Sequence, residues 1–145
     1  MKIINLKNSN NYLEEYVRLC ALEWGVPKSD EEVKKKVSEI LVNDKLISVL
    51  GLLEDDNLLG FISLFKYDGD ERRDLTPWYG TMYVKDEYRG KGYSKLLNDA
   101  IINEARNLGY NKIYLKSDLV NYYEKFGAKY IEDLECGEKL YYIDL

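Results

Sequence analysis

The sequence predicts an α/β protein, because segments with strand character alternate with segments of helical periodicity along its 145 residues. The clearest segment is an apolar run from Trp78 to Val84, which predicts a strand. A charged loop with two glycines follows this run, and a helical pattern begins near Tyr93. The middle of the chain is therefore predicted to form a strand, a glycine turn and a helix, with the other elements on either side of this unit.

The N-terminal part is predicted to hold one strand and two helices. Residues 2–6 alternate weakly between apolar and polar and favour a first strand. Apolar residues then recur at helical spacing over 12–24, where Gly25 is expected to end the helix. Ser29 or Asp30 is expected to cap the second helix. The inner faces are expected to carry Leu13, Tyr16, Val17, Cys20, Ala21 and Trp24 in the first helix, and Val33, Val37, Ile40 and Leu41 in the second.

Two further strands precede the central one. Segments 45–54 and 58–67 are apolar and are separated by a short polar stretch, 55–57. This pattern predicts a hairpin with its turn at that stretch. The charged segment 68–74 then forms a loop that leads into the central strand, 77–84.

The glycine turn and the helix after it, 93–108, have the features of an anion site. The first amides of a helix have no partner within it, and the helix dipole leaves partial positive charge there. Gly90 and Gly92 leave room for close approach of a ligand, and Arg89 and Lys91 add charge. A phosphate or pyrophosphate is the expected ligand. The loop matches neither the P-loop pattern nor the dinucleotide-binding pattern. The helical stripe comprises Tyr93, Leu96, Leu97, Ala100, Ile101, Ala105 and Leu108.

The C-terminal part is predicted to hold three strands and one short helix. Residues 111–116 favour a strand, and Asp118 is placed to cap a short helix over 119–126. The last two strands are expected at 129–134 and 139–143. The predicted order is strand, two helices, three strands, helix, strand, helix and two strands.

Composition narrows the class of protein. The chain is 46% hydrophobic and 32% charged, which is typical of a soluble globular protein, and its length fits one domain, 1–145. Its net charge of -5 argues against nucleic acid as a partner. No apolar stretch is long enough to cross a membrane and the start lacks a signal-peptide pattern, so we expect a cytoplasmic protein. There is no histidine, and Cys20 and Cys136 have no metal-ligand spacing, so no metal is expected.

Two motifs resemble one enzyme family. The loop Arg89-Gly90-Lys91-Gly92-Tyr93-Ser94 resembles the acyl-CoA-binding signature of the GNAT superfamily of N-acetyltransferases, Arg-x-x-Gly-x-Gly/Ala. The segment 122–128, Tyr-Tyr-Glu-Lys-Phe-Gly-Ala, resembles a later motif of the same family. The resemblance covers 77–131 well. It implies the GNAT fold, a mixed and strongly twisted sheet with helices on both faces. Ser94 departs from the glycine or alanine of the signature.

The resemblance also implies which residues bind the cofactor. The cosubstrate is expected to be acetyl-CoA, with its pantetheine arm bound by backbone groups of the central strand, as if it were an added strand. The pyrophosphate is expected on the glycine loop. The implied cofactor-binding residues are Met82, Tyr83, Val84, Arg89, Gly90, Lys91, Gly92, Tyr93 and Ser94.

Catalytic roles follow from the same resemblance. Tyr123 is the expected general acid that protonates the leaving thiolate of CoA, and Tyr122 is the neighbouring alternative. The carboxylate that many relatives carry as a base is replaced here by Gly80, and the family's asparagine is replaced by Lys116. The base is therefore left open between a water molecule and three carboxylates, which are Glu23, Asp74 and Glu54.

The resulting hypothesis is an N-acetyltransferase, an enzyme that moves an acetyl group from acetyl-CoA directly to a primary amine. The acidic net charge favours a small cationic acceptor. Four aromatic residues are candidates for the wall of its pocket, although core packing is the alternative for each. They are Trp24, Trp78, Tyr79 and Tyr83. The alternative function is a non-catalytic, GNAT-like module that binds acyl-CoA as a sensor. The assembly state is left open, with a homodimer as one option.

Overall fold

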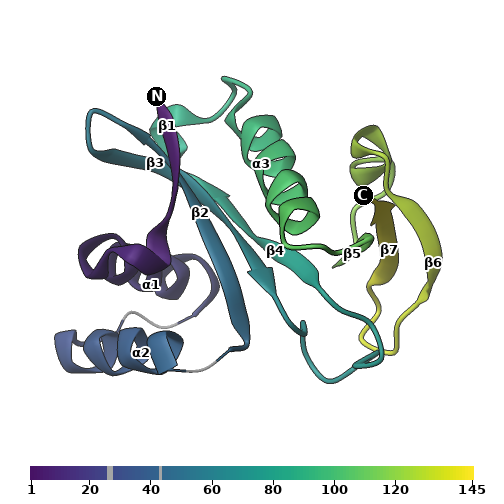
Figure 1. Ribbon diagram of the computed structural model, residues 1–145, viewed down its shortest axis with the longest axis horizontal. Coiled ribbons are helices and arrows are strands. Elements are labelled where there is room, and N and C mark those ends of the chain that lie inside the picture. Colours follow the sequence, from purple (N-terminus) through teal and green to yellow (C-terminus); the bar gives the residue numbers. More distant parts are fainter. Residues whose placement is uncertain (26–27, 43) are drawn as a thin grey trace.

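The computed structural model describes residues 1–25, 28–42 and 44–145, and these form one mixed sheet with helices on both sides (Figure 1). Within the described residues the sheet has seven strands in the order β1-β2-β3-β4-β5-β7-β6. Neighbouring strands are antiparallel except β4 and β5, which are parallel. The strands are β1 (Lys2–Asn5), β2 (Leu46–Glu54), β3 (Asn57–Phe65), β4 (Trp78–Val84), β5 (Lys112–Ser117), β6 (Lys129–Asp133) and β7 (Lys139–Asp144).

Three α-helices cover this sheet in the described part of the chain: α1 (Asn10–Trp24), α2 (Asp30–Val42) and α3 (Tyr93–Asn107). Helices α1 and α2 lie on one face and α3 lies on the other (Figure 1). Each face has its own apolar cluster. The α1-side cluster includes Leu13, Val17, Val33, Val37, Val49 and Phe61, and the α3-side cluster includes Leu50, Ile62, Tyr79, Val84, Leu97 and Ile101. The predicted α/β class and the mixed sheet with helices on both faces are confirmed.

The ends of the predicted helical faces differ from the prediction. In α1 the side chain of Trp24 is 53% exposed, and in α2 that of Leu41 is 45% exposed. Helix α2 begins as expected, because the Ser29 Oγ accepts a hydrogen bond from the Glu32 amide at 3.3 Å. Leu96 in α3 and Leu108 directly after it, both predicted to face inward, are also exposed, because α3 turns only one side toward the sheet.

One predicted helix is wrong. Residues 119–122 are irregular, and only Tyr123–Phe126 forms a short 3-10 turn, η3. Asp118 therefore caps no helix. The Leu119 amide donates instead to the Ser117 Oγ at 3.0 Å, at the end of β5. Asn121 adopts a left-handed backbone with φ 60°, which an α-helix does not tolerate, so the chain turns before η3 begins.

Strand β4 contains one residue more than the facing stretch of β3. Phe61 lies opposite Tyr83 and Ser63 lies opposite Gly80, so three steps along β4 match two along β3. Thr81, inside this bulge, has φ 50°. The bulge changes which side chains share a face. Tyr79 and Met82 both pack on the α3 side although they are three residues apart, an odd separation that would place them on opposite faces of a regular strand.

Gly60 lets β3 and β4 approach closely at the end of the bulged strand. A Cβ added there would lie 2.5 Å from the Tyr83 carbonyl oxygen and 3.1 Å from the Val84 Cα. Both atoms belong to the backbone, so the clash cannot be relieved by a side-chain rotation. We expect Gly60→Ala to lower the free energy of unfolding by about 1–3 kcal/mol, measured by chemical denaturation.

Gly25→Ala is the matched control for this prediction. A Cβ at Gly25 would lie no closer than 3.6 Å to the nearest atom recorded around it, the Ala21 carbonyl oxygen. The control should leave stability within about 0.5 kcal/mol of the wild type. Equal effects of the two variants would show that the approach of β4 to β3 at Gly60 is not tight.

Candidate active site

Strands β4 and β5 diverge from one another in the middle of the sheet. Their only recorded residue pair in the described chain is Trp78 with Tyr114, supported by the Tyr114 amide donating to the Pro77 carbonyl at 2.9 Å. Beyond this pair β5 follows β7, with which it is paired along its whole length. The edge of β4 from Tyr79 to Val84 is therefore left without a neighbouring strand on that side. Such an edge can bind an extended ligand through its backbone groups.

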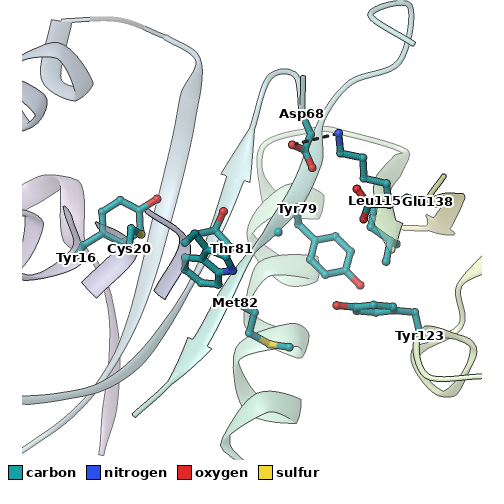
Figure 2. Close-up of a pocket in the computed structure, with 12 residues that line it drawn as sticks. Tyr16, Cys20, Asp68, Tyr79, Thr81, Met82, Leu115, Tyr123 and Glu138 are labelled. Atoms are coloured by element: carbon teal, nitrogen blue, oxygen red, sulfur yellow. Dashed lines mark ion pairs between the residues drawn. The ribbon is translucent and has the colours of Figure 1, made fainter. Parts of the chain in front are cut away.

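A cavity of about 640 Å³ lies beside this divergence. Its walls come from five parts of the chain: α1, the loop after β3, β4, the β5 strand and the segment from η3 to β7 (Figure 2). From β4 it takes Gly80, Thr81 and Met82, the residues around the bulge. The other lining residues are Tyr16, Cys20, Trp24, Asp68, Tyr79, Leu115, Lys116, Tyr123 and Glu138.

Tyr123 reaches this cavity from η3. Its ring meets that of Tyr79 edge to face, with centroids 6.3 Å apart, and the two hydroxyl groups point toward one another (Figure 2). Burial raises the pKa of Tyr123, and the charges of Tyr122 and Glu138 act in the same direction. The phenol is therefore in its acid form at neutral pH. The Tyr79 hydroxyl is buried and has no hydrogen-bond partner within the described residues.

The neighbouring Tyr122 has a different setting. It is not among the residues that line the cavity. Its ring packs edge to face on Phe126 with centroids 5.8 Å apart, and the Lys125 Nζ lies 4.8 Å from its ring centroid. Of the two adjacent tyrosines, Tyr123 is the one that faces the cavity.

The aromatic residues named from the sequence separate into two groups. Trp24 and Tyr79 line the cavity. Trp78 is buried in a small apolar cluster with Leu134 and Leu140, and Tyr83 stacks on Phe61 with centroids 5.6 Å apart. The first pair can contact a ligand, whereas the second pair belongs to the packing of the sheet.

Two carboxylates and one ammonium also face the cavity. Asp68, in the loop after β3, pairs with Lys116 of β5, with 3.9 Å between Oδ1 and Nζ (Figure 2). Burial raises the pKa of Asp68, and the nearby charge of Lys116 partly opposes this. Glu138 lies in the turn between β6 and β7, directly before the first residue of β7. Sequence reasoning missed both carboxylates, because one acidic residue among several in a charged loop carries no local signal of its position.

The three carboxylates proposed as bases lie elsewhere. Glu23 is exposed on α1, and Glu54 is exposed at the end of β2 beside the hairpin turn. Asp74 forms an ion pair with Arg72 at 3.1 Å and is 64% exposed. None of the three is among the residues that line the cavity, so the structure gives no support to any of them as the base.

The glycine loop lies at the N-terminus of α3, at the far end of β4. Gly90 and Gly92 have left-handed backbones, with φ 79° and 82°, and no side chain of the described residues caps the first turn of the helix. A Cβ at either glycine would meet no atom within 4 Å, so the space in front of the loop is open. The Arg89 Nε donates to the Val84 carbonyl at 2.7 Å, which ties the loop to the end of β4.

The other predicted cofactor residues lie on β4, in the glycine loop or in the first turn of α3. Tyr93 and Ser94 are half-buried in the first turn of α3, and Lys91 is exposed, with its Nζ 5.8 Å from the Tyr88 ring centroid. Met82 lines the cavity, and Val84 is buried against α3. The strand edge and the loop therefore form one continuous path that runs from the cavity to the helix N-terminus.

The described residues have neither a membrane-spanning helix nor a cluster of metal-binding side chains. No helix among them is both long and apolar enough to span a bilayer. No group of three or more acidic or cysteine side chains among them is arranged to hold a metal ion.

Solved structures share this fold. An N-acetyltransferase from Staphylococcus aureus Mu50 has 20% sequence identity and a TM-score of 0.68, with 99% of this chain and 97% of that chain covered. The yncA protein of Salmonella typhimurium, solved with acetyl-CoA, has 17% identity and a TM-score of 0.70, with 99% and 93% covered. An aminoglycoside 6'-acetyltransferase type Ii has 20% identity and a TM-score of 0.71, with 99% and 97% covered.

The sequence itself also matches a family. A comparison with curated proteins gives no significant match. The family described as Acetyltransferase (GNAT) family matches residues 12–128, which include the diverging strands, the glycine loop, α3 and Tyr123. The chain therefore belongs to the GNAT family of acetyltransferases.

Proposed function

We propose that this protein is an acetyl-CoA-dependent N-acetyltransferase, formed by one domain over residues 1–145, that acetylates a primary amine of a small cationic acceptor. The observation that carries the proposal is the cavity at the divergence of β4 and β5. A protonated phenol, that of Tyr123, and the carboxylates of Asp68 and Glu138 line this same cavity. An acid group and a basic group in one cavity are what acetyl transfer to an ammonium requires.

In this proposal acetyl-CoA lies along the free edge of β4. Backbone groups of Met82, Tyr83 and Val84 bind the pantetheine arm, and the amides of residues 90–94 bind the pyrophosphate. The open space in front of the two glycines and the uncapped end of α3 support this placement. The likeness to the yncA protein, which was solved with acetyl-CoA, supports it further.

The proposed transfer is direct. The acceptor nitrogen attacks the thioester carbonyl, and Tyr123 protonates the sulfur as the C–S bond breaks. An acyl-enzyme on Cys20 is disfavoured although that thiol lines the cavity, because burial raises its pKa to about 11 and so keeps it protonated. Cys136 is exposed and is not part of the cavity wall.

The charges of the cavity favour a cationic acceptor. Asp68 and Glu138 outnumber Lys116 among the lining residues, and Trp24 offers an aromatic face to a cation. One of the structures with this fold is an aminoglycoside acetyltransferase, which is consistent with an amine acceptor.

The first prediction from this proposal concerns the glycine loop. Gly92→Val should weaken binding of CoA strongly, measured by calorimetry, because the added side chain occupies the open space where the pyrophosphate would approach the amides. Gly109→Val is the control. Gly109 lies just beyond the other end of α3, has a left-handed backbone with φ 94° and also meets no atom within 4 Å. The backbone strain is therefore matched, and equal affinity of the two variants would remove the loop from the site.

The second prediction concerns Tyr123. Tyr123→Phe should lower kcat by about 10²–10⁴-fold, the range for losing a positioned acid. The Kd of acetyl-CoA should change little, because the ring and its packing on Tyr79 remain. Tyr122→Phe is the control and should leave kcat nearly unchanged, since that ring lies outside the cavity wall. A large loss in Tyr122→Phe alone would assign the acid to Tyr122.

The third prediction tests the reaction itself. Release of free CoA thiol from acetyl-CoA should depend on a primary amine in a panel of polyamines, aminoglycosides and alkylamines, and matched alcohols should be much poorer acceptors. Tight binding of acetyl-CoA without thiol release from any member of the panel would instead make the chain a non-catalytic acyl-CoA sensor. Transfer to alcohols alone would overturn the assignment as an N-acetyltransferase.

A further inference from the structure

We propose that Asp68 is the base of this site and that it accepts the proton of the acceptor ammonium, directly or through one water molecule. The inference rests on the proposed function, because a base is needed only if an amine is acetylated. A primary amine is protonated at neutral pH and has no free electron pair, so it must lose a proton before it can attack a carbonyl carbon.

The position of Asp68 in the cavity supports this role. Its carboxylate projects from the loop after β3 toward β4, on the side where Gly80 leaves room. A Cβ added to Gly80 would lie 3.9 Å from the Asp68 Oδ2, and no other atom is recorded within 4 Å of that point. The carboxylate of Asp68 therefore lies beside Gly80, which has no side chain and directly precedes the bulge at Thr81. A carboxylate supplied by the loop reaches the place that a side chain on Gly80 would otherwise occupy.

Asp68 fits the role better than Glu138, the other carboxylate of the cavity. The charge of Glu138 contributes to the raised pKa of Tyr123, so Glu138 acts on the acid group rather than apart from it. Asp68 is half-buried, and burial raises its own pKa, which makes its carboxylate a stronger proton acceptor. A base and an acid with separate surroundings can hold opposite protonation states at one pH.

The charged and titratable groups around Asp68 come from several elements. Lys116 of β5 lies 3.9 Å away and opposes protonation of Asp68. Glu138 approaches the cavity from the turn before β7, and Tyr79 and Tyr123 approach it from β4 and η3. Tyr16 and Cys20 face it from α1. The three tyrosines and the cysteine are neutral at neutral pH, because burial raises the pKa of each. Lys116 is therefore the one cation among the described lining residues that Asp68 faces.

The proton balance of the reaction is complete with these two residues. The ammonium gives one proton to Asp68, and the neutral nitrogen forms a C–N bond to the thioester carbon. The C–S bond then breaks, and Tyr123 gives its proton to the thiolate. The nitrogen loses its second proton, which restores the Tyr123 phenol, and Asp68 returns the first proton to solvent. The products are one N-substituted acetamide, one CoA thiol and one free proton.

The test compares two acceptors that differ in whether they need a base. One is the primary amine of the panel that the wild type acetylates fastest, and the other is trifluoroethylamine, which is largely neutral at neutral pH. Asp68→Asn should lower kcat/KM for the first amine by about 10²–10⁴-fold and should affect trifluoroethylamine far less. The loss for the first amine should shrink as the pH rises, because the amine then loses its proton in solution. The acid limb of its pH profile should move to higher pH, where the amine itself loses its proton, and the Kd of acetyl-CoA should not change.

Two matched variants make the result decisive. Asp70→Asn changes an exposed carboxylate two residues further along the same loop, outside the cavity wall, and should leave both activities unchanged. Glu138→Gln should leave the acid limb at the same pH as in the wild type. Equal losses for the two amines in Asp68→Asn, an unchanged pH profile, or transfer of the selective loss to Glu138→Gln would each overturn the proposal. If trifluoroethylamine is not a substrate, the pH profile with the first amine decides. An inactive wild type would instead refute the proposed function.

Discussion

The site depends on one constraint in the sheet, the divergence of the parallel strands β4 and β5. An antiparallel partner for β4 on that side would cover its backbone groups along the whole strand. Instead β4 and β5 share the pair Trp78 and Tyr114, and β5 then follows β7. The free edge of β4 and the cavity beside it both follow from this single change of partner. Tyr123 of η3 lines this cavity, and the glycine loop at the start of α3 lies at the far end of β4.

Burial then gives the groups of the cavity their different chemical states. It raises the pKa of Tyr123 and keeps the phenol protonated, and it raises the pKa of Asp68 in the presence of a nearby cation. Burial disfavours the charged form of each group. It therefore favours the neutral, protonated phenol of Tyr123, and it makes the charged carboxylate of Asp68 a stronger base. Lys116 lies 3.9 Å from Asp68, and its charge partly opposes this rise in the pKa.

The bulge at Thr81 and the two left-handed glycines are the places where local backbone geometry serves the site. The bulge brings Gly80, Thr81 and Met82 together on the cavity wall, which a regular strand would divide between its two faces. At the other end of the path, Gly90 and Gly92 open the N-terminus of α3. The sequence signalled the second feature, because glycine is the residue that adopts such backbone angles freely. It did not signal the first, because threonine at a positive φ is uncommon.

The sequence by itself determined the α/β class, the succession of strands along the chain, the helix after the glycine loop and the family motifs, because these depend on periodicity and on residues close together in the chain. Tertiary structure decided the rest. A helix expected from Asp118 does not form, since Ser117 binds the Leu119 amide and Asn121 reverses the backbone. Tyr123 rather than Tyr122 faces the cavity. Asp68 pairs with Lys116, which lies 48 residues further along the chain. No local sequence pattern predicts these contacts, because they form only when the folded sheet brings distant loops and strands together.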